Sequence, residues 1–487
     1  AFRRISRSFH AVKDSEYAPP ASLQKTLRKY QRDGYRWLRT LDGYGMGGIL
    51  ADDMGLGKTV QVLSYLLAMK QNGQTLPSLI VCPASLVLNW AEECQKFTPE
   101  LSCVVVDGDA AHRAELAESW PAADLVVTSY DLLRRDEALY EGQEFYACIL
   151  DEAQAIKNHT TQKYKAVCKV RSRVRFALTG TPVENRLGEL WSIFSFLMPG
   201  YLPPYKSFCS RFEKPIVQEE DQTAVRRLNQ LTGPFILRRM KSDVLKELPP
   251  KTENVYRIEL EEEQRKLYLA AVVDAREKLQ AAKPEDKMAV FAVLMRLREI
   301  CCDPRLIADN WEGGSAKLDA CVELVSSAVE GGHRILLFSQ FTSMLELLAK
   351  RLDAEGISHF TLQGSTPKPV RAELVRRFNG GEVSVFLISL RAGGTGLNLT
   401  AADIVIHYDP WWNVAAQNQA TDRAYRIGQQ NPVQVYKLIA QDTIEEKIVE
   451  LQQAKQSLAD TVTGTADGAI LSMRPDELLQ LLEGSEP

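Results

Sequence analysis

Apolar and polar positions along the chain follow two patterns that alternate. Short continuous runs of Val, Ile and Leu are separated by longer stretches in which apolar residues recur at helical spacing. Continuous runs predict strands buried on both faces, and the stretches between them predict the crossover helices of a parallel sheet. The pattern therefore predicts an α/β fold built on parallel sheets.

The apolar runs form two groups, which predicts two lobes. Residues 187–245 and 260–300 have helical spacing instead, and we interpret them as insertions. The first group of runs comprises residues 47–52, 78–83, 101–108, 124–130, 146–153 and 174–181. The second group comprises residues 333–340, 358–364, 383–390, 403–409 and 432–439.

The predicted domain boundaries follow from these groups. We place the first lobe at residues 24–245, with its helical insertion at 187–245. The second lobe is placed at residues 246–460, with a helical insertion at 255–315. Residues 1–23 are interpreted as a basic N-terminal extension and residues 461–487 as an acidic C-terminal tail.

Charge is unevenly distributed along the chain. The net charge is −4, but residues 1–39 carry ten Lys and Arg against three Asp and Glu, and residues 441–487 carry three against ten. A chain polarised in this way can present a basic groove to nucleic acid while staying near neutral overall. A solvated basic face is the commoner origin of such a run, so charge alone leaves the partner open.

Length and residue types narrow the class of protein. With 487 residues and 45% hydrophobic content, the chain can fill sizeable cores. No apolar run reaches the roughly 18 residues that cross a bilayer, and the N-terminus lacks the apolar core of a signal peptide, so we expect a cytoplasmic protein. The chain starts with Ala1 rather than Met, so we expect a fragment of a longer protein. The nine cysteines lack C-x-x-C spacing, which favours reduced, mostly buried thiols over a metal or redox site.

The segment ADDMGLGKTV is the first candidate for chemistry, because it follows a predicted strand and precedes a predicted helix, as a phosphate-binding loop does. Gly55 and Gly57 allow backbone N–H groups to approach phosphate. Lys58 would neutralise the β- and γ-phosphates, and Thr59 would give its hydroxyl to Mg²⁺. Asp52 stands where the usual pattern has glycine, so a structural Gly-Lys-Thr turn is the alternative.

A second motif supports the first. The segment ACILDEAQ is an apolar strand that ends in Asp151 and Glu152, where parallel strands open onto a ligand crevice. Asp151 can hold Mg²⁺ through its hydration shell, and Glu152 can take a proton from the attacking water. An isolated Asp-Glu pair usually belongs to a solvated loop, but together with Lys58 it favours an ATP site.

With these motifs the chain resembles the Swi/Snf-type ATPases, which are double-stranded DNA translocases of helicase superfamily two. The phosphate loop of that family reads D-x-M-G-L-G-K-T, so Asp52 fits the family's own form of the loop. The resemblance extends over residues 24–450. It is carried by the blocks LRKYQRDGYRWL, VCPASLVLNW, VVTSYDLL, ALTGTPVENRLGELWSIFSFLMPG, FILRRMKSDVLKELPPK, LREICCDPRLI, LLFSQF and LISLRAGGTGLNLTAADIVIHYDPWWNVAAQNQATDRAYRIGQ.

The resemblance implies two RecA-like lobes with family-specific helical insertions, and ATP and Mg²⁺ as cofactors. Arg423 and Arg426 would be arginine fingers that reach ATP from the opposite lobe. Since two arginines three positions apart share a helix face, a surface ion-pair role is the alternative. The implied catalytic residues are Lys58, Asp151, Glu152, Arg423 and Arg426, and the implied metal ligands are Thr59 and Asp151. ATP would contact Gln31, the adenine-recognition glutamine, and Asp52, Asp53, Met54, Gly55, Leu56, Gly57, Lys58, Thr59 and Gly396.

The resemblance also implies coupling and DNA-binding residues. The family usually has His where this chain has Gln154, whose amide can still bridge the phosphate site to Thr179 or Gln340 but cannot be protonated. We therefore expect hydrolysis to survive and coupling to be altered. The implied coupling residues are Gln154, Thr179, Gly180, Thr181 and Gln340. The implied DNA contacts are Arg238, Arg239, Lys241, Arg391, Thr395 and Trp412, for the last of which core packing is the alternative. VCPASLVLNW and VVTSYDLL resemble segments that meet the nucleic-acid backbone.

The function that the resemblance implies is ATP-driven tracking along double-stranded DNA through sequence-nonspecific backbone contacts, which remodels or displaces protein–DNA complexes. The alternatives are a strand-separating helicase on RNA or single-stranded DNA, and a non-catalytic scaffold that keeps the fold. We expect a nucleoid-associated bacterial member of the family, monomeric and without a membrane partner. The sequence does not identify the DNA-bound protein on which it acts.

Overall fold

The chain divides into two compact units, Ala1–Lys246 and Glu247–Pro487, and each is described by itself. The computed structural model describes residues 17–180, 187–219, 221–245, 248–281, 283, 286–308, 310–393, 397–411, 414–452, 478, 479 and 482. Each unit is built on one parallel sheet, so the predicted α/β fold class is confirmed.

The first unit contains a seven-stranded parallel sheet in the order β3-β4-β2-β5-β6-β1-β7. Its central strands are buried along almost their whole length, because helices cover both faces. The strands are β1 (Gly48–Leu50), β2 (Ser78–Cys82), β3 (Cys103–Val105), β4 (Leu125–Ser129), β5 (Glu144–Leu150), β6 (Arg171–Leu178) and β7 (Ile236–Leu237).

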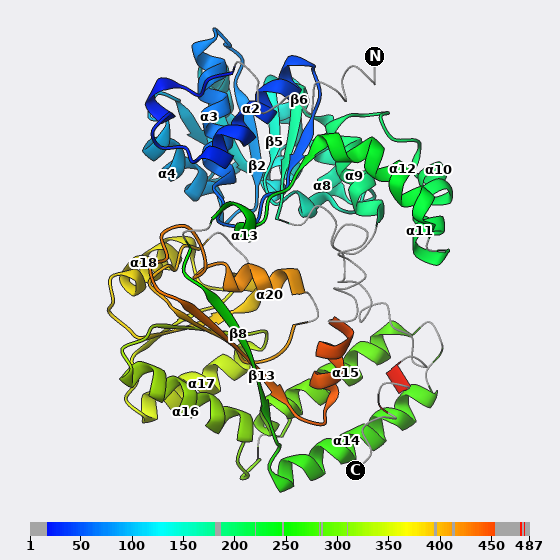
Figure 1. Ribbon diagram of the computed structural model, residues 1–487, viewed down its shortest axis with the longest axis vertical. Helices are drawn as coiled ribbons and strands as arrows, with labels where there is room; N and C mark the ends of the chain where they lie inside the picture. Colours follow the sequence, from blue (N-terminus) through cyan, green and yellow to red (C-terminus); the bar gives the residue numbers. More distant parts are fainter. Residues whose placement is uncertain are drawn as a thin grey trace. The chain divides into compact units, whose positions relative to one another are not determined.

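The helices of the first unit lie on two sides of this sheet. Right-handed crossovers place the helices that follow β1 and β2 on one face and those that follow β4, β5 and β6 on the other. Figure 1 shows α2, α3 and α4 on one side and α8 and α9 on the other. Their bounds are α2 (Lys29–Gly43), α3 (Lys58–Gln71), α4 (Val87–Phe97), α5 (Ala110–Ser119), α6 (Tyr130–Arg135), α7 (Glu137–Glu141), α8 (Gln162–Lys169) and α9 (Leu187–Leu197).

The predicted insertion at residues 187–245 is helical except for one short strand. It contains α9, α10 (Tyr205–Phe208), α11 (Lys214–Gln218), α12 (Gln222–Thr232) and α13 (Lys241–Val244). Ile236 and Leu237 form β7, which pairs with Ile49 and Leu50 of β1 at the edge of the sheet. The strand was not predicted, since two residues are too short for any periodicity to appear.

The second unit contains a six-stranded parallel sheet in the order β10-β11-β9-β12-β13-β8. Alternate side chains of its central strands enter two separate cores. Leu337 and Leu387 face one core, whereas Leu336 and Phe386 face the other. The strands are β8 (Lys251–Ile258), β9 (Ile335–Ser339), β10 (His359–Leu362), β11 (Val385–Ser389), β12 (Ile404–His407) and β13 (Val433–Ala440).

Helices close both cores of the second unit. Residues of α16 and α17 pack in the core with Leu337, and residues of α18 and α20 pack in the core with Leu336. A long helical pair, α14 and α15, precedes them and has a core of its own (Figure 1). The bounds are α14 (Glu262–Ala281), α15 (Lys287–Cys302), α16 (Ala316–Glu330), α17 (Thr342–Ala354), α18 (Lys368–Asn379), α19 (Leu390–Gly393) and α20 (Val414–Thr421).

The strand β8 departs from the predicted pattern. It pairs with β13 over residues 251–258 at the edge of the second sheet, within a stretch predicted to be helical from residue 255. Its side chains are mostly exposed, with Val255 40% and Tyr256 51% exposed. An edge strand that is open to solvent needs no continuous apolar run, so its sequence lacks the signal of the buried strands.

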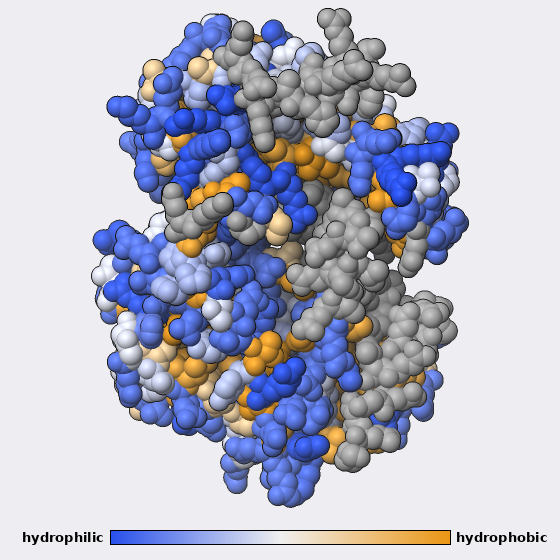
Figure 2. Space-filling model, viewed as in Figure 1, coloured by the Kyte–Doolittle hydropathy of each residue, from blue (hydrophilic) through white to orange (hydrophobic). Residues whose placement is uncertain are grey.

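The visible surface carries mainly hydrophilic residues, with apolar residues in separate patches (Figure 2). Among the residues that the structure describes, no helix combines the length and the apolar character needed to span a membrane.

Candidate functional site

The segment between β1 and α3 forms a tight loop over residues 51–57. Gly55 and Gly57 have φ values of 81° and 75°, in the left-handed region that favours glycine. Gly57 caps α3, so the helix begins at Lys58 and directs its first N–H groups and its positive dipole end toward the loop. This is the backbone arrangement of an anion-binding site at a helix N-terminus.

Lys58 folds back over its own loop. Its Nζ donates hydrogen bonds to the backbone oxygen of Asp52, at 2.7 Å, and to that of Asp53, at 3.5 Å. The side chain is only partly buried. The ammonium therefore lies at the loop, where it can exchange carbonyl contacts for phosphate oxygens.

The helix α2 supports this loop from one side. Tyr30 Oη and Gln31 Nε2 both donate to the backbone oxygen of Leu56, at 3.0 and 3.1 Å. Gln31 Oε1 accepts from the N–H of Arg28 at 2.9 Å, and burial raises the pKa of Tyr30 to about 12. Gln31 thus holds the loop, and its contact with an adenine stays a prediction.

An ion pair that also contacts α2 gives the loop further support. Arg239 Nε donates to Asp52 Oδ1 at 2.8 Å, and its Nη2 donates to Asp52 Oδ2 and, at 2.7 Å, to Gln61 Oε1. Gln61 Nε2 in turn donates to Asp52 Oδ2 at 3.1 Å. The Asp52 side chain is fully buried, so it ties β1 to the segment after β7.

The helix α2 has glycine where it crosses this network. A Cβ at Gly34 would lie 1.8 Å from Gln61 Oε1 and 2.8 Å from Arg239 Nη2. Gly34 is therefore needed for the close approach of α2 to the ion pair.

The network changes the interpretation of the predicted DNA contacts in the first unit. Arg239 is engaged by Asp52, and Lys241 is 6% exposed with its N–H bonded to Asp53 Oδ2 at 2.9 Å. The Lys241 side chain is buried and the Arg239 side chain is 13% exposed, and the contact of either with DNA stays a prediction. Arg238 is exposed, and its role in DNA binding stays a prediction.

Asp151 follows β5 at the carboxyl end of the sheet. Its Oδ2 accepts from Trp90 Nε1 at 2.9 Å, its Oδ1 accepts from the N–H of Glu152 at 2.9 Å, and its backbone oxygen accepts from Tyr130 Oη at 2.9 Å. Trp90 and Tyr130 belong to the two segments that were expected to meet nucleic acid; both side chains are buried and hold Asp151, and a contact of these segments with nucleic acid stays a prediction. Trp90 lies on α4, the helix that follows β2, and Tyr130 directly follows β4; the position of these two strands beside β5 brings both side chains to Asp151.

The carboxyl group of Asp151 is electrostatically unusual. Burial and the neighbouring charge of Glu152 raise the pKa of Asp151 to about 7, against the opposing effects of the Trp90 hydrogen bond and of Lys58. A nearby cation favours the ionised form of a carboxyl group, so it would lower a pKa that burial has raised. The donor set of Asp151 and the Thr59 hydroxyl, both oxygen ligands, fits Mg²⁺.

Glu152 has a backbone conformation that is rare for its residue type, with φ 48° and ψ 55°. Its Oε2 accepts from Gln154 Nε2 at 2.7 Å, and Gln154 Oε1 accepts from Thr179 Oγ1 at 3.0 Å. The amide of Gln154 therefore connects Glu152 to Thr179, which is fully buried at the end of β6. Strain of this kind is found at functional sites, where the surroundings hold it in place.

The order of strands explains why these residues converge. β5, β6 and β1 are neighbours in a parallel sheet, so their carboxyl ends meet at one edge. Leu50 pairs with Leu178, which brings Thr179 beside the phosphate loop. Gly180 follows, and a Cβ there would lie 3.4 Å from Met54 Cγ.

In the second unit, Gln340 follows β9 in the same way. Its N–H donates to Asp409 Oδ1 at 3.2 Å, and Asp409 lies just after β12. Among the described residues, the buried Nε2 atom of Gln340 has no hydrogen-bond partner. Its role in coupling stays a prediction.

The two predicted arginine fingers do not lie on a helix. α20 ends at Thr421, and residues 422–428 form turns and a bend, so the expectation of a shared helix face is wrong. Arg423 is 2% exposed and its backbone oxygen accepts from the N–H of Leu399, at 3.1 Å. Arg426 is partly exposed and donates through Nη1 to the backbone oxygen of Leu397 at 3.4 Å.

Some predicted site residues lie outside the described part of the chain. They are Thr181, Thr395, Gly396 and Trp412, together with the side chain of Arg391. Most of the basic extension and of the acidic tail also lies outside it.

Comparison with known proteins gives two domain matches. Residues 30–306 match the SNF2-related domain, and residues 316–428 match the helicase conserved C-terminal domain. A solved structure described as the Sulfolobus solfataricus SWI2/SNF2 ATPase core in complex with dsDNA has a TM-score of 0.47 and 36% identity, over 90% of this chain and 93% of that chain.

Relatives with curated descriptions are longer than this chain. An uncharacterized ATP-dependent helicase of Mycoplasma genitalium is 40% identical over 94% of this chain and 44% of its own length. The putative ATP-dependent helicase/translocase YwqA of Bacillus subtilis is 40% identical over 98% of this chain and 53% of its own length. The TATA-binding protein-associated factor MOT1 of Saccharomyces cerevisiae is 34% identical over 98% of this chain and 30% of its own length. The chain thus spans about half or less of the length of these relatives.

Proposed function

The chain belongs to the SNF2-related family, and from this premise we propose that it is an ATP-driven translocase on double-stranded DNA that remodels or displaces protein–DNA complexes. The observation that carries the proposal is the convergence of Lys58, Asp151 and Thr179 at one edge of the first sheet. This edge combines an anion-binding loop with a carboxyl pair, which suits hydrolysis of a nucleoside triphosphate.

In this proposal the phosphate loop binds the β- and γ-phosphates. Lys58 leaves the carbonyl oxygens of Asp52 and Asp53 and neutralises phosphate charge, while the N–H groups at the start of α3 donate to phosphate oxygens. Glu152 accepts a proton from the attacking water. Gln154 keeps the Glu152 carboxylate oriented through its hydrogen bond of 2.7 Å.

Thr59 and Asp151 would hold Mg²⁺. The ion supplies charge compensation for the phosphates when it is bound. Asp151 is prepared for this role by Trp90 and the N–H of Glu152, which fix both of its carboxyl oxygens. The donors leave each oxygen with further acceptor capacity for the hydration shell of the ion.

Double-stranded DNA is the proposed polymer. A relative with 40% identity over nearly the whole chain is named as a helicase/translocase, which supports tracking along nucleic acid. Arg238 is exposed and suits a contact with a backbone phosphate. Other relatives are named for association with TATA-binding protein, and we propose that this chain likewise acts on a DNA-bound protein. Because bacterial proteins are among the relatives, we place this activity at the nucleoid.

A strand-separating helicase is the competing function, since two Mycoplasma relatives are named helicases. Two assays on one preparation distinguish them. A translocase on duplex displaces a third strand from a triplex, or a protein roadblock from DNA, with ATP and without strand separation. Efficient unwinding of a partial duplex, with no displacement of the third strand, would replace the proposal with the helicase.

A further inference from the structure

A buried ion pair in the second unit joins the helical insertion to the ends of two strands. Arg298 lies on α15, and Asp409 lies just after β12. Arg298 Nη2 donates to Asp409 Oδ2 at 3.1 Å, and both side chains are fully buried. Two charges are tolerated in such a place only when hydrogen bonds satisfy the remaining acceptors and donors.

The carboxylate of Asp409 fixes the turn that follows β9. Its Oδ1 accepts from Ser339 Oγ at 2.6 Å and from the N–H of Gln340 at 3.2 Å. Ser339 Oγ also accepts from the N–H of Phe341 at 3.1 Å. β9 and β12 are paired neighbours, so one carboxylate closes the carboxyl ends of both strands.

Arg298 contacts both strand ends at once. Besides Asp409, its Nη2 donates to the backbone oxygen of Pro410, at the start of the segment that leads to Trp411. The guanidinium carbon lies 5.5 Å from the ring centroid of Phe341. A planar guanidinium can stack on a ring and donate in its own plane at the same time, which an ammonium cannot do.

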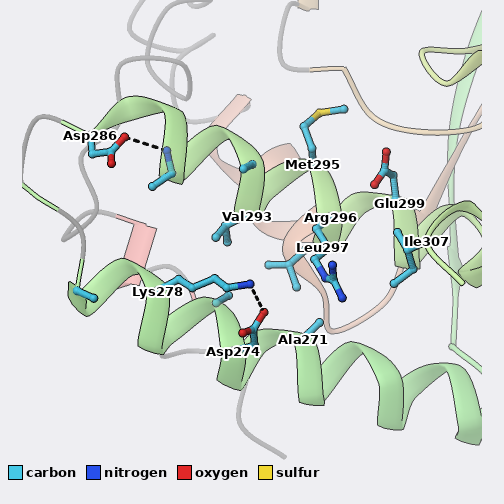
Figure 3. Close-up of a pocket in the computed structure, with 14 residues that line it drawn as sticks. Ala271, Asp274, Lys278, Asp286, Val293, Met295, Arg296, Leu297, Glu299 and Ile307 are labelled. Atoms are coloured by element: carbon cyan, nitrogen blue, oxygen red, sulfur yellow. Dashed lines mark hydrogen bonds and ion pairs between the residues drawn. The ribbon is translucent and has the colours of Figure 1, made fainter.

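On another face, α15 packs against α14 in a shared apolar core. A cavity of about 590 Å³ lies beside this core and is lined by residues of both helices, including Ala271 and Ala275 of α14 and Ala289 of α15. Figure 3 shows Arg296 of α15 at this cavity, two positions before Arg298 and hence on a different face of the helix. Apolar packing joins α15 to α14, and the contacts of Arg298 on the far side of α15 join the insertion to the ends of β9 and β12.

We propose that Arg298 is a positioning residue that ties the helical insertion to Gln340 and to the segment that begins at Pro410, and thereby sets how strongly DNA stimulates ATP hydrolysis. The buried amide nitrogen Nε2 of Gln340 has no hydrogen-bond partner among the described residues. The position of the Gln340 main chain therefore decides which acceptor this nitrogen can bond to. The effect on DNA-stimulated hydrolysis rests on the proposed function. The link between the insertion and the strand ends rests only on the contacts of Arg298.

The informative variant is the double change Arg298→Met with Asp409→Asn. It removes both charges, so no uncompensated carboxylate is left in the core. The Asn oxygen can still accept from Ser339 and from the N–H of Gln340, while the tie to Pro410 and Phe341 is lost. The matched control is Arg296→Met, which removes an exposed arginine of the same helix at the cavity.

We expect the double variant to melt near the wild-type temperature and to bind ATP with wild-type affinity. Its basal hydrolysis should be retained, while the ratio of kcat with saturating duplex to kcat without it should fall about tenfold. The KM for ATP should stay the same. The Arg296→Met variant should match the wild type in every measurement.

Full DNA stimulation in the folded double variant would overturn the proposal and leave Arg298 with a structural role only. If the double variant does not fold, Arg298→Lys replaces it, since Lys keeps a positive charge beside Asp409 but lacks the planar fork. The same loss of stimulation is expected, and its absence would overturn the proposal.

Hydrogen exchange separates this inference from the proposed function. The amides of Phe341 and Trp411, next to the groups that lose their contact with Arg298, should exchange faster in the double variant than in the wild type, with or without DNA. A wild type that DNA does not stimulate would refute the proposed function, whereas unchanged exchange at these amides would refute the tie.

Discussion

Arg239 forms an ion pair with the fully buried carboxylate of Asp52 beside the phosphate loop, although 187 positions separate the two residues in the sequence. Their contact joins β1, which leads into the loop, to the segment that follows β7. Gln61 of α3 forms hydrogen bonds with both residues of the ion pair. One polar network therefore joins the phosphate loop, α3 and the end of the helical insertion. The precision of the proposed ATP site depends on this network as much as on the loop itself.

Removal of Arg239 should therefore act on stability rather than on DNA affinity. Arg239→Ala leaves the buried Asp52 carboxylate without its partner, which should cost about 3–5 kcal/mol in the free energy of unfolding. Arg238→Ala is the matched control, because Arg238 is the exposed neighbour. It should lower DNA affinity and the salt dependence of binding without changing stability. Denaturant unfolding and DNA titrations of both variants check this, and a stable Arg239→Ala variant with weakened DNA binding would contradict it.

Substitutions of Lys58 and Glu152 should lower the rate of ATP hydrolysis for two different reasons. Lys58→Ala should lower kcat by about 10²-fold or more, because a preorganised charge on the phosphates is lost. Glu152→Gln should keep ATP binding and lower kcat by about 10²–10⁴-fold, because the general base is lost. Both variants should keep the wild-type fold by circular dichroism. Substantial steady-state hydrolysis by either purified variant would show that its role has been assigned wrongly.

Gln154→His should alter turnover without altering ATP affinity. In the structure the amide donates to Glu152 and accepts from Thr179, and a neutral imidazole can do both only if its two nitrogens reach the same partners. We expect ATP affinity to stay nearly constant while kcat or its stimulation by DNA changes. Nucleotide titration and hydrolysis assays measure the two separately. A large loss of ATP affinity would place this side chain in nucleotide binding instead.

The single variant Arg298→Met should be least stable at high pH. Burial raises the pKa of Asp409 above its ordinary value, and Arg298 opposes this shift, with smaller effects of Lys317, which lowers the pKa, and Glu445, which raises it. Without Arg298 the pKa of the folded state rises further above that of the unfolded state. The folded variant then binds more protons than the unfolded chain, so its stability falls as pH rises through the folded pKa. Unfolding at several pH values checks this, and a pH-independent loss would exclude Asp409 as the cause.

Arg426→Ala should remove most DNA-stimulated hydrolysis. An arginine that stabilises developing phosphate charge contributes about 10³–10⁵ in rate, while ATP binding should hardly change. Arg376→Ala is a suitable control, because Arg376 is an exposed residue of α18 whose ion pair with Glu373 lies on the surface. An Arg426→Ala variant with the same fold-stimulation by DNA as the wild type would assign Arg426 a structural role.

Much of the fold and the phosphate loop could be predicted because their signals are local. The buried strands are continuous apolar runs, and Gly55, Gly57 and Lys58 are adjacent in sequence. Contacts between distant segments could not be predicted in this way. Neither the engagement of Arg239 by Asp52 nor the support of Asp151 by Trp90 has a sequence pattern, since each depends on strand order. The arginine pair was misplaced on a helix because the end of α20 at Thr421 carries no Gly or Pro signal.

Steady-state hydrolysis shows whether this chain hydrolyses ATP in response to double-stranded DNA. The rate is measured without nucleic acid, with duplex DNA of arbitrary sequence and with RNA at matched salt, and Lys58→Ala gives the background. We predict strong stimulation by duplex, weak stimulation by RNA, and a loss of the DNA effect as salt rises, because the proposed contacts are made to phosphates. Hydrolysis that duplex DNA leaves unchanged, or that RNA stimulates as strongly, would refute the proposed translocase.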